Sequence, residues 1–328
     1  MPVEEIKPKE IKEESVEEIK SSSNPSIEQI NRDTEQKYRF VGNNKLSDIK
    51  DVNKLLVDLS YRMDEKHHYL VIPIGLPNSG KSMFIASLLA YAFRRSENDT
   101  SCSFREFFDR KVSGIGEILD ALDQRATLPS TKQGEFTIID IAMKTRHDEE
   151  LVISILDFSG EDLKCVSRDI ANMEKDRAMD IVKIRTILDS CVTKPSIFAL
   201  VTPVCTTAQY REFDRAEDDA MIAFIDYVKE KNANLYDTTK FLMVVSKWDT
   251  LNGNVDARTF LSDHRQQLYA EYSIHKNKKS YGLLTYSVGI VVSSTITQIN
   301  LTYSQNFWHT LYYWCIGKHV LPFWKRKY

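Results

Sequence analysis

Short apolar runs alternate with amphipathic segments over most of the chain. Runs of the kind found in buried strands occupy residues 69–74, 196–201 and 241–245. Between them, apolar residues recur at the spacing of helices that bury one face. Strands that alternate with helices are typical of a doubly wound α/β domain with a mostly parallel sheet, and we predict that fold class.

One pair of predicted strands is joined differently. Residues 136–144 and 151–158 are both strand-like, and a polar turn at Arg146–Glu150 separates them. Two strands connected by such a turn are predicted to form an antiparallel hairpin.

The same patterns place the remaining elements. An amphipathic helix is predicted at 46–63, and a helical insert is predicted between Phe104 and Leu122. The uncharged stretch 281–308 is too polar for a membrane span and is predicted to be a core strand followed by a loop. The other expected elements are helices at 161–193, 214–231, 259–272 and 306–316 and a strand at 283–287.

The first 36 residues are rich in Glu, Lys and Ser and contain no aromatic residue. Such a segment buries too little apolar surface to offset the entropy of ordering it. We expect a disordered tail at 1–36, with a docking or targeting peptide as the alternative. Residues 37–328 are expected to form a single domain with an extra N-terminal helix and helical inserts.

Charge and cysteine content narrow the class of protein. A formal net charge of -3 over 328 residues argues against a nucleic-acid surface. The five cysteines show no paired spacing, so neither a disulfide framework nor a zinc site is predicted. That pattern suits a reducing cytoplasm, and the charged start of the chain is unlike a secretory signal. His67 and His68 are interpreted as surface residues, since no further metal ligand is suitably spaced.

The C-terminal segment combines aromatic residues with the basic run Lys325-Arg326-Lys327. This combination is found at membrane interfaces. A closing helix packed on the sheet, with a solvated basic end, is the favoured interpretation, so membrane contact is not expected.

A phosphate-binding signature directly follows the first buried strand. Residues 75–82 read GLPNSGKS, a complete GxxxxGKS between a predicted strand and a predicted helix. The glycines let the backbone wrap a pyrophosphate, successive N–H groups point inward, and the helix N-terminus adds partial positive charge. Lys81 is expected to reach the β- and γ-phosphates, and the Ser82 hydroxyl is expected to ligate Mg²⁺. The predicted nucleotide contacts in this loop are Gly75, Asn78, Ser79, Gly80, Lys81, Ser82 and Met83.

A second motif, DxxG, runs from Asp157 to Gly160 at the end of strand 151–158. An acidic residue at this place can hold Mg²⁺ through a water, and the glycine N–H can donate to the γ-phosphate. An ordinary strand-to-turn junction is the alternative. The position downstream of the phosphate loop favours the functional interpretation.

A third motif, Ser246-Lys247-Trp248-Asp249, follows the buried strand 241–245. Guanine offers two adjacent donors that one carboxylate accepts, whereas adenine presents an acceptor there. Asp249 is therefore predicted to select guanine, with the stem of Lys247 along the base plane. A surface lysine and a helix-capping aspartate are the alternative.

A last loop at Ser287 and Val288 ends strand 283–287 with small residues. A backbone N–H there is expected to meet the guanine carbonyl. The stretch Val292-Ser293-Ser294 competes for the same role.

In order and context these motifs resemble the TRAFAC class of P-loop GTPases, which contains the Ras-like and translation-factor families. The resemblance covers roughly residues 69–316. The long helical inserts and the aromatic closing helix look more like predicted bacterial GTPases of the double-GTPase type than like compact Ras-like switches. The resemblance implies a protein that binds GTP and GDP with Mg²⁺ and hydrolyses GTP as a regulatory switch, read by an unidentified protein effector or activator.

Such families also place a threonine before the second strand, where it binds Mg²⁺ and the γ-phosphate. Thr131 is the candidate here, with Thr127 in reserve. The resemblance implies catalytic roles for Lys81, Gly160, Glu161 and Thr131, and Mg²⁺ ligation by Ser82, Thr131 and Asp157.

Three positions widen the range of interpretations. Glu161 stands where many family members carry a water-orienting glutamine, and a carboxylate cannot donate to the γ-phosphate as an amide can. A GTP-binding module with little or no hydrolysis therefore stays open, as does a P-loop ATPase or kinase. Asn78 resembles the asparagine of potassium-stimulated GTPases, in which K⁺ replaces an arginine finger. Arg125 is either an internal arginine finger or an exposed residue at a helix end.

Overall fold

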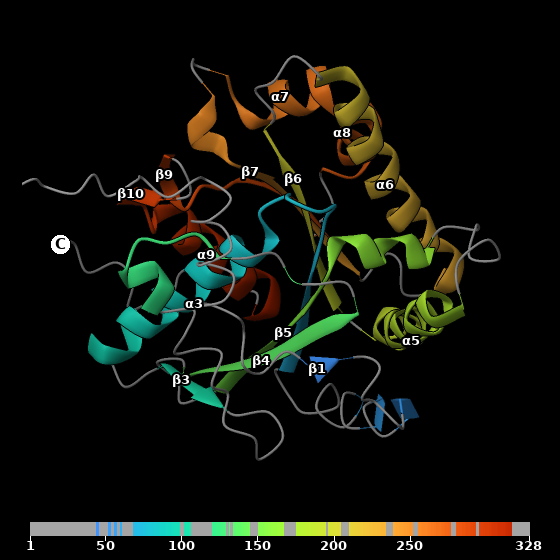
Figure 1. The fold of residues 1–328 in the computed structure, drawn as a ribbon, viewed down its shortest axis with the longest axis horizontal. Helices are drawn as coiled ribbons and strands as arrows, with labels where there is room; N and C mark the ends of the chain where they lie inside the picture. The colour runs from blue at the N-terminus through green and yellow to red at the C-terminus, as the bar shows by residue number, and fades with distance from the viewer. Residues whose placement is uncertain are drawn as a thin grey trace, which may run out of the picture.

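The structure is a computed structural model, drawn in Figure 1. The predicted tail 1–36, most of the predicted helix 46–63 and the basic C-terminal end lie outside the residues that it describes. The described residues are 44–45, 52–53, 56–57, 60, 68–98, 102–105, 120–128, 131, 134–144, 150–166, 175–194, 196–204, 210–233, 239–251, 255–276, 280–292 and 295–316.

A central sheet organises the described part of the chain. Its eight strands follow the order β1-β4-β5-β2-β6-β7-β8, and β3 also pairs with β4. Strands β5, β2, β6, β7 and β8 are parallel to one another, whereas β4 is antiparallel to β1, β3 and β5. The bounds are β1 Asn44–Lys45, β2 His68–Ile74, β3 Cys102–Arg105, β4 Glu135–Lys144, β5 Glu150–Phe158, β6 Ser196–Pro203, β7 Lys240–Ser246 and β8 Tyr281–Thr285. This confirms the predicted mixed α/β class with a mostly parallel sheet, consistent with a P-loop fold.

The β4–β5 pair is the predicted antiparallel hairpin. Its register runs from Phe136 opposite Phe158 to Lys144 opposite Glu150. The first buried strand is also where the apolar run indicated, and β2 pairs in parallel with β5 and β6.

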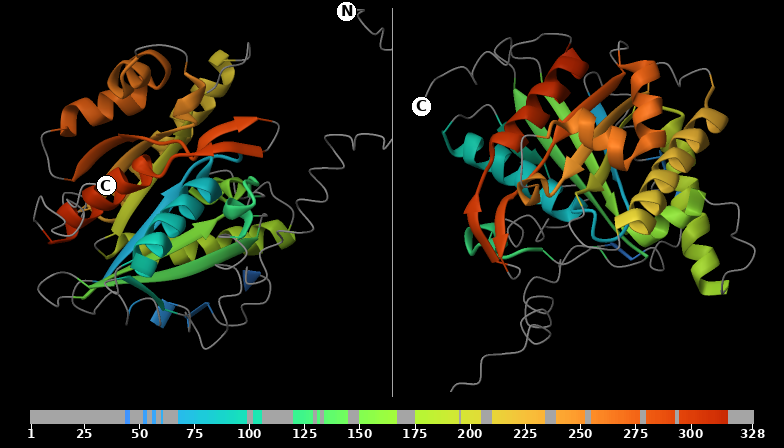
Figure 2. Two further views of the ribbon diagram at one scale, coloured as in Figure 1. Left: turned by 90° about the vertical axis from the view of Figure 1, so that its left-hand side faces the viewer. Right: turned by 90° about the horizontal axis from the view of Figure 1, so that it is seen from above.

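Helices cover both faces of the sheet, as Figure 2 shows from two sides. In β6, Phe198 and Leu200 belong to one buried core, while Ile197, Ala199 and Val201 belong to the other. This alternation is what a strand buried on both faces requires. On the Phe198 side lie α5 (Lys175–Val192), α6 (Tyr210–Lys231), α7 (Ala257–His264) and α8 (Gln266–His275), and on the Ile197 side lie α3 (Lys81–Asn98) and α9 (Thr302–Ile316).

The predicted helical insert begins instead with a strand. Cys102–Arg105 forms β3 on the outer edge of β4, with Phe104 opposite Ile141. An open strand edge offers a ladder of backbone hydrogen bonds that a local helical pattern does not reveal. Residues 106–119 lie outside the described part, and a helical turn is present at 120–123.

Two other predicted helices are divided. Residues 160–166 form the 3₁₀ helix η2 rather than the start of an α-helix, and α5 begins at Lys175. The predicted helix 259–272 is two helices, α7 and α8, because Arg265 leaves the helical conformation at φ -138° and ψ 62°. The Arg265 side chain is fully buried at the end of β6, where it donates to Thr202 Oγ1 over 2.7 Å.

The segment after β8 is a second hairpin rather than the predicted loop. Strands β9 (Gly289–Val292) and β10 (Thr295–Ile299) pair antiparallel, and α9 then starts at Thr302, four residues earlier than predicted. The His68 prediction was also wrong. Its side chain is buried, and its Nε2 lies 2.6 Å from Ser154 Oγ.

The β9–β10 hairpin is bonded to the chain just before the Thr131 loop. The Ile296 N–H donates to the Arg125 carbonyl over 2.7 Å, and the Arg125 guanidinium donates to the Thr297 carbonyl over 3.2 Å. Ala126 forms an isolated bridge with Thr295. Arg125 itself is exposed at the end of a helical turn, with a left-handed φ of 58°.

None of the helices that the structure describes combines the length and apolar character needed to cross a membrane.

Candidate functional site

The loop between β2 and α3 contains a tight turn. The Ser79 N–H donates to the Leu76 carbonyl over 3.2 Å, with Pro77 and Asn78 as the central residues and Asn78 at φ 64°. Proline followed by a residue with positive φ is typical of a type II turn. Gly80 also has a positive φ, 92°, at the entrance to α3.

Gly75 fits where no side chain would. A Cβ added to it would lie 2.5 Å from the Val201 carbonyl oxygen and 2.5 Å from Ser79 Oγ. The loop is therefore pressed against the end of β6, which fixes its shape.

Lys81 folds back over this loop. Its ammonium donates to the Gly75 carbonyl over 2.7 Å and to the Leu76 carbonyl over 3.4 Å. Burial lowers the pKa of Lys81, and the neighbouring carboxylates of Asp157, Glu217 and Asp162 act in the opposite direction. The result is a cation held at the first turn of α3, where phosphate oxygens are favoured.

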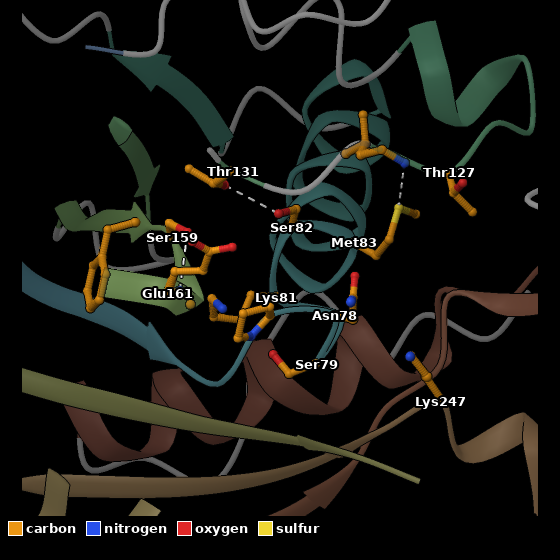
Figure 3. Close-up of a pocket in the computed structure, with 15 residues that line it drawn as sticks. Asn78, Ser79, Lys81, Ser82, Met83, Thr127, Thr131, Ser159, Glu161 and Lys247 are labelled. Carbon is orange, nitrogen blue, oxygen red and sulfur yellow. Dashed lines mark hydrogen bonds between the residues drawn. The ribbon is translucent and has the colours of Figure 1, made fainter. Parts of the chain in front are cut away.

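A cavity of ≈ 380 Å³ opens beside the loop, as Figure 3 shows. Its walls come from four separate segments, which the sheet topology brings together at the edge where β2, β5 and β7 end and the antiparallel β4 begins. The lining residues are Pro77–Met83 from the loop and α3, Thr127, Leu128 and Thr131, Phe158–Glu161 after β5, and Lys247 after β7.

The three residues predicted as Mg²⁺ ligands converge at one point of this site. Thr131 Oγ1 donates to Asp157 Oδ2 over 2.8 Å and lies 3.4 Å from Ser82 Oγ. Asp157 is buried, and its Oδ1 has no hydrogen-bond partner. Burial raises the pKa of Asp157, while Lys81 and the hydrogen bond from Thr131 pull it down.

This oxygen cluster fits a hard divalent cation. Two hydroxyls and one carboxylate with a free lone pair are the donor set that Mg²⁺ uses when phosphate oxygens and water complete its shell. Among the described residues no group of three or more His, Cys, Asp or Glu side chains could hold a metal alone. A cation held by Ser82, Thr131 and Asp157 would need further oxygen ligands to fill its shell.

The DxxG glycine packs against the phosphate loop itself. A Cβ on Gly160 would lie 2.5 Å from the Pro77 nitrogen and 2.5 Å from the Leu76 carbonyl carbon. Glu161, the next residue, is exposed and lines the cavity, as Figure 3 shows. The turn after β5 and the phosphate loop are thus in backbone contact.

Asp162 links this turn to the segment that follows Thr131. Its side chain is fully buried, and its Oδ2 accepts a hydrogen bond from the Gly134 N–H over 3.2 Å. Sequence analysis did not select Asp162, because one acid among three polar residues in a turn carries no distinctive pattern.

The residues predicted to select the base begin at the end of β7, where Ser246 contacts the phosphate loop. Ser246 Oγ donates to the Ser79 carbonyl over 2.5 Å, and Lys247, with φ 55°, extends into the cavity wall. Asp249 is exposed and is not part of the cavity lining. Its Oδ1 accepts a hydrogen bond from Ser287 Oγ over 2.5 Å.

The motif at 246–249 and the last loop are therefore adjacent, although about 40 residues separate them in the chain. The Trp248 N–H also donates to the Tyr286 carbonyl over 3.0 Å, and Val288 is buried beside them. Of the competing stretch, Val292 is exposed on the hairpin, and Ser293 and Ser294 lie outside the described residues.

Comparison with known proteins found a family match. Residues 72–181 match the family model described as Double-GTPase 1. Over this segment the chain is similar to the double-GTPase type. No curated protein matches the chain.

The double-GTPase segment contains the phosphate loop, Thr131 and the DxxG turn, but not the motif at 246–249. The residues predicted to contact the base therefore lie outside the matched segment, whereas most of those predicted to contact the phosphates lie within it.

A group of buried charges beyond the double-GTPase segment was missed by sequence analysis. Three acids of α6 are buried: Asp214, Glu217 and Asp218. Arg265, between α7 and α8, is buried as well. Glu217 and Asp218 follow Asp214 by three and four residues, in phase with the apolar face that continues at Met221. This spacing was the signal in the sequence that these acids are buried, because an acid on the apolar face of a helix does not point into solvent.

Proposed function

We propose that the chain binds GTP with Mg²⁺ and hydrolyses it to GDP and phosphate as a regulatory switch. The observation that carries this proposal is the convergence of Ser82, Thr131 and Asp157 beside the Lys81 loop. Guanine nucleotide binding is what the double-GTPase match suggests. Hydrolysis and the switch are our inference from the site.

In this proposal the phosphates occupy the loop 75–82. The backbone N–H groups and Lys81 would bind the β- and γ-phosphates, with Asn78, Ser79, Gly80 and Met83 contributing to the same wall. Lys81 would exchange the carbonyls of Gly75 and Leu76 for phosphate oxygens, which offer a charged acceptor instead of a neutral one.

Mg²⁺ would be held by Ser82 and Thr131, with Asp157 directly or through water. Its chemistry would be to neutralise charge that develops on the phosphate oxygens. The orphaned Asp157 Oδ1 supports this assignment, since a buried carboxylate oxygen without a partner is unfavourable unless a cation joins it.

Guanine selection would fall to Asp249. The hydrogen bond from Ser287 orients the carboxylate, and Ser246 fixes the start of this motif to the phosphate loop. Lys247 lies between Ser246 and Asp249 in the chain and lines the cavity, so its stem would cover the base. Ser287 and Val288 would supply the backbone N–H for the guanine carbonyl.

Switching would use the loop at Thr131 and the turn at Gly160. Both segments line the same cavity, so a γ-phosphate placed there would contact both at once. Loss of the γ-phosphate would release them, and a protein effector that reads these loops would distinguish the two states. Glu161 would position the attacking water by accepting its hydrogen bond.

A second candidate function is a GTP-binding module that scarcely hydrolyses. Glu161 favours it, because this exposed carboxylate in the cavity has no N–H to donate to the γ-phosphate. Single-turnover hydrolysis by the purified chain separates the two. Conversion of bound GTP to GDP supports the switch, and bound GTP that persists for hours supports the module.

The nucleotide class is tested by competition. Fluorescent GTP bound to the chain should be displaced by excess GTP or GDP and not by the same excess of ATP. Lys81→Met should abolish binding, whereas Lys276→Met, which alters an exposed lysine after α8, should leave it unchanged. Equal displacement by ATP would favour a P-loop ATPase or kinase instead.

A further inference from the structure

Glu217 is a buried acid for which the proposed function has no use. It lies on α6, its side chain is fully buried, and neither carboxylate oxygen has a hydrogen-bond partner. The two neighbouring acids on that face of α6 do have hydrogen-bond partners, so Glu217 differs from them in having none.

The adjacent Arg265 does not satisfy it. The Arg265 guanidinium donates to Thr202 Oγ1, to Asp214 Oδ1, to the Pro203 carbonyl over 3.0 Å and to the His264 carbonyl over 2.8 Å. These bonds tie α6 and α8 to the end of β6. Glu217 therefore receives the field of Arg265 without a direct hydrogen bond from it.

Asp218 is also fully engaged. Its two carboxylate oxygens accept hydrogen bonds from the Gln267 and Leu268 N–H groups, each over 2.8 Å, and so cap the start of α8. Asp214 accepts from Arg265 and contacts His264 Nδ1 at 3.0 Å. The two acids on either side of Glu217 thus make the hydrogen bonds that join this face of α6 to its neighbours.

The helix face that carries Glu217 is joined through Arg265 to Thr202 and Pro203 at the end of β6. The phosphate loop packs against the same strand end, where a Cβ on Gly75 would lie 2.5 Å from the Val201 carbonyl oxygen. The charged groups that act on Glu217 are Arg265 from the α7–α8 junction, Lys81 from the phosphate loop, Lys247 from the base motif and Asp214 from its own helix. The three cations favour the carboxylate form, and Asp214 opposes it. Burial outweighs them and raises the pKa of Glu217 to about 7.

We propose that Glu217 takes up a proton when nucleotide binds, so that nucleotide affinity is linked to pH. This inference rests on the proposed function, because it needs phosphates at Lys81. The proton comes from solvent and joins one carboxylate oxygen, which turns a buried anion into a neutral acid.

The cause is the charge that the nucleotide brings. In the empty site Lys81 and Lys247 stabilise the Glu217 anion. Phosphates paired with Lys81 cancel part of that field, and their own negative charge repels the carboxylate across a medium of low dielectric constant. Protonation removes this repulsion.

The direction of the pH effect follows from linkage. Below the pKa of the empty site, Glu217 is already neutral and binding meets no penalty. Above it, binding must draw in a proton or accept the repulsion, so affinity falls as pH rises through and beyond about 7. Each unit by which nucleotide raises this pKa weakens binding by about tenfold at high pH.

The experiment compares nucleotide affinity between pH 6 and 8.5 for the full-length wild type and Glu217→Gln, with Mg²⁺ and GDP. The glutamine is a neutral replacement of the same shape and represents the protonated acid. It should bind about three- to tenfold more tightly than the wild type at pH 8.5 and about equally at pH 6. Glu217→Asp, which keeps a titratable group, should retain the pH dependence.

The matched control is Glu230→Gln, an exposed acid on the same helix, which should follow the wild-type profile. Titration calorimetry in two buffers of different ionisation enthalpy provides a measurement independent of any variant. At pH 7.5 the wild type should take up a fraction of a proton more per GDP than Glu217→Gln does. If a variant does not fold, no net proton uptake by the wild type overturns the proposal.

The outcomes separate the two inferences. Coinciding pH profiles for the wild type and Glu217→Gln, with tight guanine nucleotide binding by both, overturn the proton linkage alone. Failure of the wild type to bind any guanine nucleotide overturns the proposed function, and the linkage with it.

Discussion

The Thr131 hydroxyl donates a hydrogen bond of 2.8 Å to the Asp157 carboxylate, which joins the loop before β4 to the end of β5. Ser82 lies 3.4 Å from the same hydroxyl, so one threonine connects the phosphate loop and the DxxG turn. Thr127 also lines the cavity, but the bond from Thr131 to Asp157 makes Thr131 the residue that we propose for the switch.

Thr131→Ala should therefore reduce GTP hydrolysis by roughly tenfold to a hundredfold at saturating Mg²⁺, because one positioned oxygen at the metal and γ-phosphate is lost. Thr127→Ala should stay within about twofold of the wild type, since the hydrogen bond to Asp157 comes from Thr131 and is kept. Single-turnover rates with GTP across a Mg²⁺ series measure both. A larger loss in Thr127→Ala than in Thr131→Ala would reverse the assignment.

The contact of Gly160 with the phosphate loop predicts a severe effect from one methyl group. In Gly160→Ala, the new Cβ would meet the Pro77 nitrogen and the Leu76 carbonyl carbon at 2.5 Å, and backbone atoms cannot move aside as a flexible side chain can. We expect a loss of about 1–3 kcal/mol in the free energy of unfolding, measured by urea denaturation.

A suitable control is Gly282→Ala. Its Cβ would approach side-chain atoms, Trp314 at 2.8 Å and Leu242 at 2.9 Å, so a smaller loss is expected. Equal stability of Gly160→Ala and the wild type would show that the turn does not rest on the loop in solution.

The sequence predicted the elements whose signal is local. The strand before Gly75, the β4–β5 hairpin and the buried strand before Ser246 have continuous apolar or turn patterns, and each is present. The motifs also carry their own spacing. This is why Lys81 and Asp157 could be named before their contacts were known, whereas Thr131 was a candidate only through the family resemblance, with Thr127 in reserve.

The predictions were wrong where contacts between residues far apart in the chain determine the structure. β3 forms because β4 offers an edge, the break at Arg265 follows from its bonds to Thr202 and Pro203, and β10 is bonded to Arg125. None of these partners is near in sequence. Glu217 was overlooked because its helix is rich in acids, although its phase on the helix was visible.

The Asp249 assignment predicts a change of nucleotide preference. Asp249→Asn should weaken GTP binding by about a hundredfold or more and improve xanthosine triphosphate, because the amide donates where the carboxylate accepted. Displacement assays with GTP and xanthosine triphosphate measure the change. Ser287→Ala removes the hydrogen bond that orients Asp249. It should weaken the binding of GTP without improving the binding of xanthosine triphosphate. Loss of both nucleotides in Asp249→Asn, with the fold intact, would indicate that Asp249 does not face the base.

Asn78 offers a test of potassium stimulation. The residue is exposed at φ 64°, so Asn78→Gly keeps the turn while it removes the side-chain amide, whereas alanine would also add backbone strain. If the amide helps to hold K⁺ at the phosphates, GTP turnover in potassium should exceed that in sodium by about tenfold or more for the wild type, and the two should be equal for Asn78→Gly. Equal wild-type rates in both salts would remove the idea.

Glu217 also predicts how the stability of the empty protein depends on pH. Burial raises the pKa of this acid from 4.5 in the unfolded chain to about 7 in the fold, so between these values the folded state holds more protons. Stability from this group is therefore fully present below pH 4.5 and is lost as pH rises through about 7. Glu217→Gln removes the titration and should be more stable than the wild type at pH 8, by up to roughly 3 kcal/mol, with little difference near pH 5.

Urea unfolding without nucleotide at both pH values measures this, and Glu230→Gln serves again as the exposed control. A variant less stable than the wild type at pH 8 would mean that the charged carboxylate is satisfied in the fold.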